Sequence, residues 1–191
     1  MTVIYWVRHG PTHEKTFVGH RDVPADLSDA AQITRLSAAL PANALVVSSD
    51  LKRSIDTATA LKGARTRLPH RTGLREFDFG DWDGMHFSDV SKNWPDLSRS
   101  YWETPGDVAP PNGESWNAAA ARITADITDL TTQHPRRDII AVAHFGVILT
   151  QVAQAANIAP YRALSHRIDN FSITEIQIRP TWGVARINHL A

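Results

Sequence analysis

Two histidines and two arginines follow three apolar segments of the chain, each near the point where a segment ends. Arg8 and His9 come directly after the first segment, and His144 comes directly after the third. Arg53 follows the second segment within a few positions. If the segments are neighbouring parallel strands, their carboxyl ends meet at one edge of a sheet, where open α/β sheets bind ligands. The sequence therefore predicts one site that holds all four side chains.

This set of side chains suits phosphoryl transfer through a phosphohistidine. The transferred group spreads its charge over three oxygens, so catalysis consists mostly of positioning and charge stabilisation. Arg8 and Arg53 would supply planar, permanently charged groups that bind phosphate oxygens in pairs. His144, and the free N–H groups of a helix that opens at Gly146, would donate further hydrogen bonds. His9 would be the nucleophile, because two nearby arginines disfavour the imidazolium form.

A leaving alkoxide also needs a proton, and the segment LREFDFGDWDG holds the candidates for its donor. Glu76 lies among aromatic and glycine residues, where burial would raise its pKa and keep it protonated near neutral pH. Neighbouring arginines would oppose that shift. Asp78, Asp81 and Asp83 remain rivals on spacing alone.

The elements that position these residues alternate between strand and helix. Short apolar runs at 3–7, 44–47 and 139–143 are typical of strands covered on both faces. Residues 171–178 alternate like a half-buried edge strand, and 183–187 is expected to pair with it across a turn at 180–183.

Four helices are expected between or after these strands: from Ser28 or Asp29 to Leu40, from Ser49 or Asp50 to about Leu61 with a stop near Gly63, from about Gly113 to Gln133, and after Gly146. The repeated order predicts a three-layer α/β/α sandwich with a mostly parallel mixed sheet. Residues 77–112 break the pattern, and we interpret them as a small insertion over the active-site edge. Its three tryptophans are expected to serve packing.

Length and composition favour a single catalytic domain over residues 1–191. Twenty basic and twenty acidic residues cancel, which argues against nucleic acid or a membrane surface as partner. The absence of cysteine excludes disulfides, thiolate metal sites and a cysteine nucleophile. No apolar run approaches the roughly 20 residues that span a bilayer, and no secretory signal is recognisable, so a cytoplasmic location is expected.

Together the motifs resemble those of the histidine phosphatase superfamily, in its phosphoglycerate mutase-like branch. RHGPT resembles the R-H-G-x-[ST] opening through Arg8, His9, Gly10 and Thr12, and GHRDVP resembles the G-x-x-D-x-P that follows. LSDAAQ, SSDLKRSIDTA, PPNGES and AVAHFGVI look like further family segments. LREFDFGDWDG is similar to L-x-E-x-x-x-G-x-W-[ED]-G, which places the general acid on Glu76. The resemblance runs from about residue 3 to 150.

The resemblance implies that His9 accepts the phosphate, that Glu76 donates the proton, and that Arg8, Arg53 and His144 form the phosphate pocket. It implies a phosphoglycerate mutase-like fold, no metal and no organic cofactor. The ligand would be a small phosphorylated metabolite. The oligomeric state stays open, a homodimer being one option.

The sequence also departs from the family pattern. Pro11 stands where the family often has Glu, and Phe145 stands where many members have Gly. The loop 10–19 is short and lacks a common asparagine, so His13 or Lys15 is expected near the substrate. These departures concern substrate identity more than reaction type. Thr12 is a further candidate for substrate binding.

Four functions remain in view at this stage. A phosphomonoester hydrolase similar to the α-ribazole phosphatase-like group is favoured, because the chain and its insertion are short. A phosphoglycerate mutase would need a lid that excludes water. A catalytically silent module that binds a phosphorylated ligand is the third. A metal site is the weakest, since the nine histidines form no HExxH motif. His20 is the one further histidine expected to border the pocket.

Overall fold

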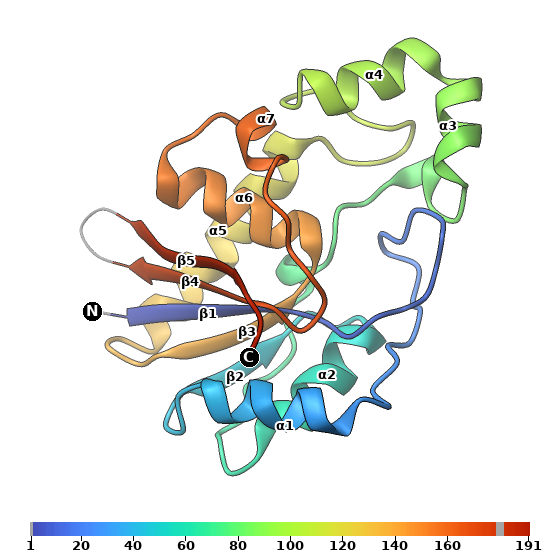
Figure 1. Cartoon of the computed structure of the whole chain (residues 1–191). Coiled ribbons are helices and arrows are strands. Elements are labelled where there is room, and N and C mark those ends of the chain that lie inside the picture. The colour runs from blue at the N-terminus through green and yellow to red at the C-terminus, as the bar shows by residue number, and fades with distance from the viewer. Residues whose placement is uncertain (1, 179–181) are drawn as a thin grey trace.

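The computed structural model describes residues 2–178 and 182–191, which contain a five-stranded sheet (Figure 1). Its strands are β1 (Thr2–Arg8), β2 (Leu45–Ser48), β3 (Ile139–Ala143), β4 (Ile173–Ile178) and β5 (Gly183–His189), in the order β2-β3-β1-β4-β5. Pairs β2–β3 and β3–β1 are parallel, whereas β1–β4 and β4–β5 are antiparallel. Among the described strands only β4 therefore runs against the others. The expected pairing of the last two strands is confirmed, but the turn between them lies mostly outside the described residues.

Helices cover both faces of this sheet, as the continuous apolar strands predicted (Figure 1). On one face lie α1 (Ala30–Ala39) and α2 (Lys52–Lys62), and on the other lie α5 (Trp116–Gln133) and α6 (Phe145–Ala156), followed by α7 (Pro160–Ala163). The short 3-10 helices η1 (Thr72–Leu74) and η2 (Gly80–Trp82) precede α3 (Phe87–Asn93) and α4 (Pro95–Glu103). The three-layer α/β/α sandwich is confirmed.

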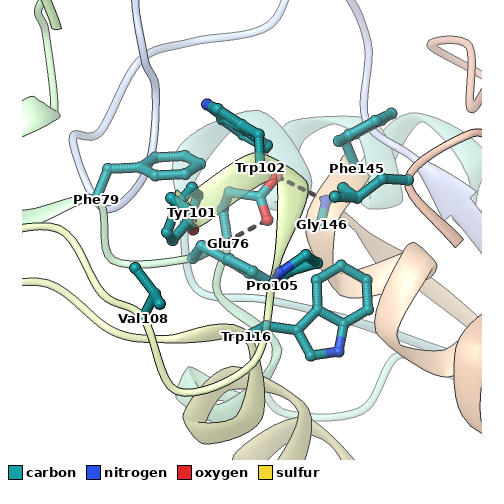
Figure 2. Close-up of a pocket in the computed structure, with 11 residues that line it drawn as sticks. Glu76, Phe79, Tyr101, Trp102, Pro105, Val108, Trp116, Phe145 and Gly146 are labelled. Carbon is teal, nitrogen blue, oxygen red and sulfur yellow. Dashed lines mark hydrogen bonds between the residues drawn. The ribbon is translucent and has the colours of Figure 1, made fainter. Parts of the chain in front are cut away.

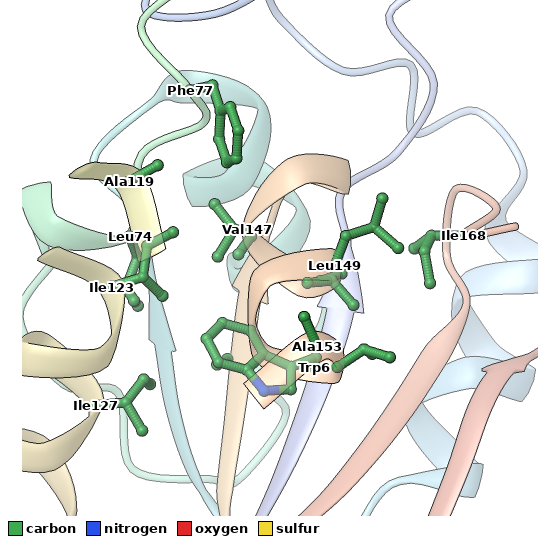
Figure 3. Packing of buried hydrophobic residues seen from close by; sticks show 14 of the residues in the cluster. Trp6, Leu74, Phe77, Ala119, Ile123, Ile127, Val147, Leu149, Ala153 and Ile168 are labelled. Atoms are coloured by element: carbon green, nitrogen blue, oxygen red, sulfur yellow. The ribbon is translucent and has the colours of Figure 1, made fainter. Parts of the chain in front are cut away.

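Buried side chains of β3 show how one strand serves two cores. Ile139, Ala141 and Ala143 belong to the cluster under α5 and α6, whereas Ile140 and Val142 belong to the cluster under α1 and α2. Figure 3 shows the first cluster, in which residues of α5 and α6 surround Trp6 of β1. Burial of each Val, Leu or Ile side chain stabilises the fold by about 1.5–3 kcal/mol. Packing on both faces of the sheet therefore fixes the register of the strands that carry the site.

The helix termini match the sequence in α1 but not at the start of α2. Asp29 caps α1 through a 2.9 Å bond from the Gln32 N–H. Leu51 is the N-cap of α2, so the expected cap by Ser49 or Asp50 is wrong. The N–H of Lys52, the first residue of α2, donates instead to the Asp22 carboxylate at 2.6 Å. The Asp50 carboxylate instead makes a paired contact with Arg75, at 2.6 and 2.7 Å. Such a charge-assisted pair is stronger than a single capping bond.

The other helix boundaries lie close to the positions expected from the sequence. Gly63 ends α2 with a φ of 52°, and α5 begins at Trp116 after a Ser115 cap rather than near Gly113. Residues 77–112 fold into η2, α3 and α4 beside the carboxyl edge of the sheet, where the insertion was expected (Figure 1). Trp82 is fully buried against Tyr101, which confirms its packing role. Trp102 differs, because it is 37% exposed and lines a cavity.

Candidate active site

The parallel register brings the ends of β1 and β3 together. Arg8 is paired with Ala143, so the next residues, His9 and His144, lie side by side with ring centroids 5.1 Å apart. Arg53, in the first turn of α2, reaches the same place and donates from Nε to Nδ1 of His144 at 3.2 Å. The structure thus brings together the four side chains that follow the strands.

The His9 ring is buried and held in one tautomer. Nδ1 lies 2.7 Å from the Gly10 carbonyl, which can only accept, so Nδ1 carries the proton and Nε2 keeps its lone pair. Burial, reinforced by the Arg53 charge, lowers the pKa of His9 to about 3. The Asn170 amide donates to the His9 carbonyl at 2.7 Å, and the Gly10 N–H donates to Thr57 at 3.0 Å. His9 is therefore a neutral imidazole on a fixed backbone.

The two arginines differ in how much of each guanidinium remains available. Arg53 also donates to the carbonyls of Gly19 (2.7 Å) and Arg21 (3.0 Å). Arg8 donates from Nη1 to the Ile168 carbonyl at 2.6 Å, whereas its Nε is buried with no partner among the described residues. Burial lowers the pKa of both guanidinium groups, and the nearby carboxyl of Glu76 opposes that shift. Both remain cations, and Arg8 keeps more N–H groups for an anion.

Both ring nitrogens of His144 are engaged by the protein. Because Nδ1 accepts from Arg53, the proton lies on Nε2, which donates to the Ser49 hydroxyl at 2.8 Å. Burial, then the Arg53 charge, lowers the pKa of His144 well below its usual value. The expected hydrogen bond from His144 to phosphate therefore requires one of these contacts to open. As it stands, the ring orients Arg53.

Of the four acids that the sequence offered as proton donor, Glu76 is the one that lines the cavity with His9. Its carboxylate accepts the N–H of Phe77 at 3.0 Å through Oε1 and the N–H of Gly146 at 3.1 Å through Oε2. Burial raises the pKa of Glu76, while these two bonds and the Arg53 charge oppose the rise. The Gly146 N–H, expected to bind phosphate, is thus committed to the carboxylate.

The rivals of Glu76 have structural partners instead. Asp78, Asp81 and Asp83 each accept hydrogen bonds from groups of neighbouring loops, and none of the three lines the cavity in the described structure.

Two further side chains hold the backbone that carries Glu76. Arg122 of α5 donates to the carbonyls of Gly73, Arg75 and Glu76, each at 2.9 Å, and pairs with Glu114. His20, expected to border the pocket, does not line the cavity, but its Nε2 donates to the Glu76 carbonyl at 2.9 Å. The sequence did not indicate this role for Arg122, because an arginine on a long amphipathic helix is typical of a solvated face.

The cavity above His9 has a volume of about 270 Å³ and is also lined by Arg8, Arg53 and Thr12. His13 and Lys15, expected near the substrate, lie exposed on the loop and outside this lining. Their neighbour Glu14 lines the cavity instead, and its carboxylate binds Arg21 at 2.9 Å.

Glu76 also lines a second, narrow pocket of about 30 Å³ (Figure 2). Apart from the carboxyl, its walls are almost wholly apolar and include Phe77, Tyr101 and Trp116. Figure 2 shows Glu76 among the rings of Tyr101, Trp102 and Trp116, with Gly146 bonded to its carboxylate. Glu76 therefore lines both the cavity beside His9 and this apolar pocket.

No group of three or more His, Cys, Asp or Glu side chains that could hold a metal ion occurs in the described part of the chain. Within residues 2–178 and 182–191, no helix is long and apolar enough to cross a membrane.

Known proteins resemble this chain in sequence. The model of the histidine phosphatase superfamily (branch 1) matches residues 4–189. A glucosyl-3-phosphoglycerate phosphatase of Mycobacterium tuberculosis is 34% identical over 159 residues, which cover 74% of this chain and 70% of that protein. The adenosylcobalamin/alpha-ribazole phosphatase of Escherichia coli is 26% identical over 192 residues, which cover 96% and 94% of the two chains.

Solved structures extend the similarity over nearly the whole chain. Bacillus stearothermophilus YhfR superposes with a TM-score of 0.88 at 25% identity, covering 97% of this chain and 96% of that one. Native mycobacterial glucosyl-3-phosphoglycerate phosphatase superposes with a TM-score of 0.86 at 25% identity, covering 99% of both chains. The chain therefore belongs to the histidine phosphatase superfamily, as its motifs indicated.

Proposed function

We propose that this protein hydrolyses small phosphomonoesters through a phosphohistidine at His9. The lone pair on Nε2 attacks phosphorus, and the bond to the ester oxygen breaks. Arg8 and Arg53 neutralise the charge on the non-bridging oxygens. His144 holds Arg53 in place. Thr12, at the cavity wall, contacts the bound phosphate or the group attached to it.

Glu76 moves the proton in both halves of the reaction. As a carboxylic acid it protonates the leaving alkoxide, so the alcohol departs neutral. As a carboxylate it then takes a proton from the water that attacks the phosphohistidine, which restores His9 and releases inorganic phosphate. The phosphate dianion favours the protonated acid at the start, because two negative charges side by side raise the pKa of Glu76.

The observation that carries this proposal is the tautomer of His9. The Gly10 carbonyl accepts a hydrogen bond from Nδ1–H, and the pKa of about 3 keeps Nε2 unprotonated at neutral pH. A histidine that served only packing would need neither the lone pair nor two arginines beside it. The relatives from Mycobacterium tuberculosis and Escherichia coli are named phosphatases, which supports the same reaction for this chain.

The test is hydrolysis of p-nitrophenyl phosphate in EDTA by the wild type, His9→Ala and a matched control, His134→Ala. His134 follows the last residue of α5, away from the site. We expect phosphate release without metal in the wild type and the control, and none in His9→Ala. A rapid alkaline quench followed by mass spectrometry should find phosphate on the His9 peptide.

Turnover that survives in His9→Ala would overturn the mechanism. Turnover that EDTA abolishes would also contradict it, because the proposed steps use side chains alone. The cytoplasmic location stays a prediction, which cell fractionation would check. The oligomeric state stays open, with a homodimer as one option, and the mass in solution would decide it.

A further inference from the structure

The cavity beyond the phosphate-binding end is walled by aromatic rings. Phe17, a buried residue of this wall, has ring centroids 4.5 Å from Phe87, 5.0 Å from Phe79 and 6.2 Å from Trp102, which is stacked on it. Phe87 and Trp102 are 51% and 37% exposed, unlike most large apolar side chains of this fold. Exposed aromatic residues grouped around a cavity are typical of a ligand site.

The charges of the cavity serve one anionic group. Arg8 and Arg53 are the only arginine or lysine side chains that line it within the described structure, and both lie at the phosphate end beside His9. Glu14 adds a negative charge to the wall, and its partner Arg21 lies outside the lining. A second anion on the ligand, such as a carboxylate, would lose its water without gaining a cation.

The narrow pocket beside Glu76 continues the apolar surface, because Phe79 and Trp102 line both spaces. Its volume of about 30 Å³ is that of one water or one small substituent. The hydroxyl of Tyr101 is buried there and has no hydrogen-bond partner among the described residues. An unpartnered buried hydroxyl is destabilising, and a neutral acceptor on a ligand would supply its missing partner.

We propose that the alcohol released by this enzyme is uncharged and carries an aromatic or similarly flat apolar group. The ring packs against Phe17, Phe87 and Trp102, while its phosphate occupies the end formed by Arg8 and Arg53. Phosphomonoesters with a carboxylate or a second phosphate are poor substrates. This inference rests on the proposed function, since it names the substrate class of the same site.

Three primary alkyl phosphates with similar leaving groups test the inference by their kcat/KM: 2-phenylethyl phosphate, glycerol 3-phosphate and 3-phosphoglycerate. We expect 2-phenylethyl phosphate to exceed glycerol 3-phosphate by about tenfold or more, because the ring buries apolar surface against aromatic walls. We expect 3-phosphoglycerate, which differs from glycerol 3-phosphate by its carboxylate, to be lower by about tenfold. A ranking that places 3-phosphoglycerate or glycerol 3-phosphate first would overturn the inference.

Variants locate the selectivity. Trp102→Ala should reduce the preference for 2-phenylethyl phosphate over glycerol 3-phosphate by about tenfold. Tyr161→Ala is the matched control, since Tyr161 is 60% exposed on α7 and lies outside the cavity lining. Glu14→Gln should raise kcat/KM for 3-phosphoglycerate selectively. An unchanged preference in Trp102→Ala would contradict the proposed location of the ring.

Failure of this inference can be told apart from failure of the proposed function. If His9 becomes phosphorylated by p-nitrophenyl phosphate but carboxylated esters are the better substrates, only the substrate class is wrong. A loss of 3-phosphoglycerate activity in Lys15→Ala would then identify the cation responsible. If no substrate phosphorylates His9, the proposed function itself fails.

Discussion

Gly146 provides a direct test of the role of Glu76, because a single methyl group there would displace the carboxyl. A Cβ at position 146 would lie 2.6 Å from Oε1 of Glu76 and 2.9 Å from Cδ1 of Phe77. Gly146 lies in the first turn of α6, where alanine is a better helix former by up to about 1 kcal/mol. Gly146→Ala should therefore move the acid without unfolding the helix.

The size of the effect follows from the displacement. Ordinary contact begins near 3.4 Å, so Oε1 must retreat by about 0.8 Å. A misplacement of about 1 Å costs about 100-fold in rate, and general acid catalysis supplies about 10²–10⁴-fold. We expect kcat/KM for phenyl phosphate to fall by about 30- to 100-fold in Gly146→Ala.

The assay compares phenyl phosphate with p-nitrophenyl phosphate, which presents the same ring. The nitro group makes the leaving phenol more acidic, so its departure needs less protonation, and we expect a fall of less than about threefold. Gly183→Ala is the matched control, because a Cβ at Gly183 would meet nothing within 4 Å. Wild-type rates on phenyl phosphate, or equal losses on both substrates, would refute proton donation by Glu76.

Three further predictions address the charged groups of the site. The kcat/KM of the wild type should decline as pH rises through the raised pKa of Glu76, and Glu76→Gln should lose this decline because an amide does not ionise. A pH profile with phenyl phosphate measures the decline. If Glu76→Gln retains it, the decline belongs to another group. Arg53→Lys should lower kcat/KM by about 100-fold with unchanged circular dichroism, because an ammonium cannot replace the planar group that binds His144 and Gly19. A kcat/KM near the wild-type value would contradict that geometry. The pKa of His9 is about 3 in the folded chain and about 6.5 in the unfolded chain. Between these values the unfolded chain binds a proton at His9 and the folded chain does not. The free energy of unfolding therefore falls as pH drops below 6.5. Urea unfolding at pH 7 and 4.5 should show that His9→Ala removes roughly 3 kcal/mol of this dependence, whereas equal dependence in both proteins would place the buried charge elsewhere.

The parts of the fold that depend on local patterns could be predicted from the sequence. The apolar run at 139–143 is also β3 in the structure, and Asp29 caps α1 as its side chain suggested. The gathering of His9 and His144 followed from one rule about parallel strands, and the register of β1 with β3 places them there. The resemblance to the family motifs indicated Glu76 among four acids, and Glu76 is the one of the four that lines the cavity.

The remaining features depend on contacts between distant residues, which no local pattern contains. Asp50 looked like a helix cap, but Arg75, which is 25 residues away, provides a stronger partner. Asn170 follows His9 by 161 positions and still holds its carbonyl, so no spacing could link them. Trp102 resembled the other tryptophans of the insertion, and only the fold distinguishes the one that lines the cavity.

The apolar pocket beside Glu76 couples the choice of substrate to the chemistry of the acid. Phe77, Tyr101 and Trp116 exclude water from one side of the carboxyl, and this loss of hydration raises its pKa. A cation in that pocket would pair with a carboxylated substrate, but it would also lower the pKa of Glu76 and weaken the proton donor. A flat apolar group bound across the opening has the opposite effect, because it displaces the remaining water and raises the pKa further. The surface that disfavours a second anion is thus the same surface that keeps Glu76 protonated for alkyl leaving groups.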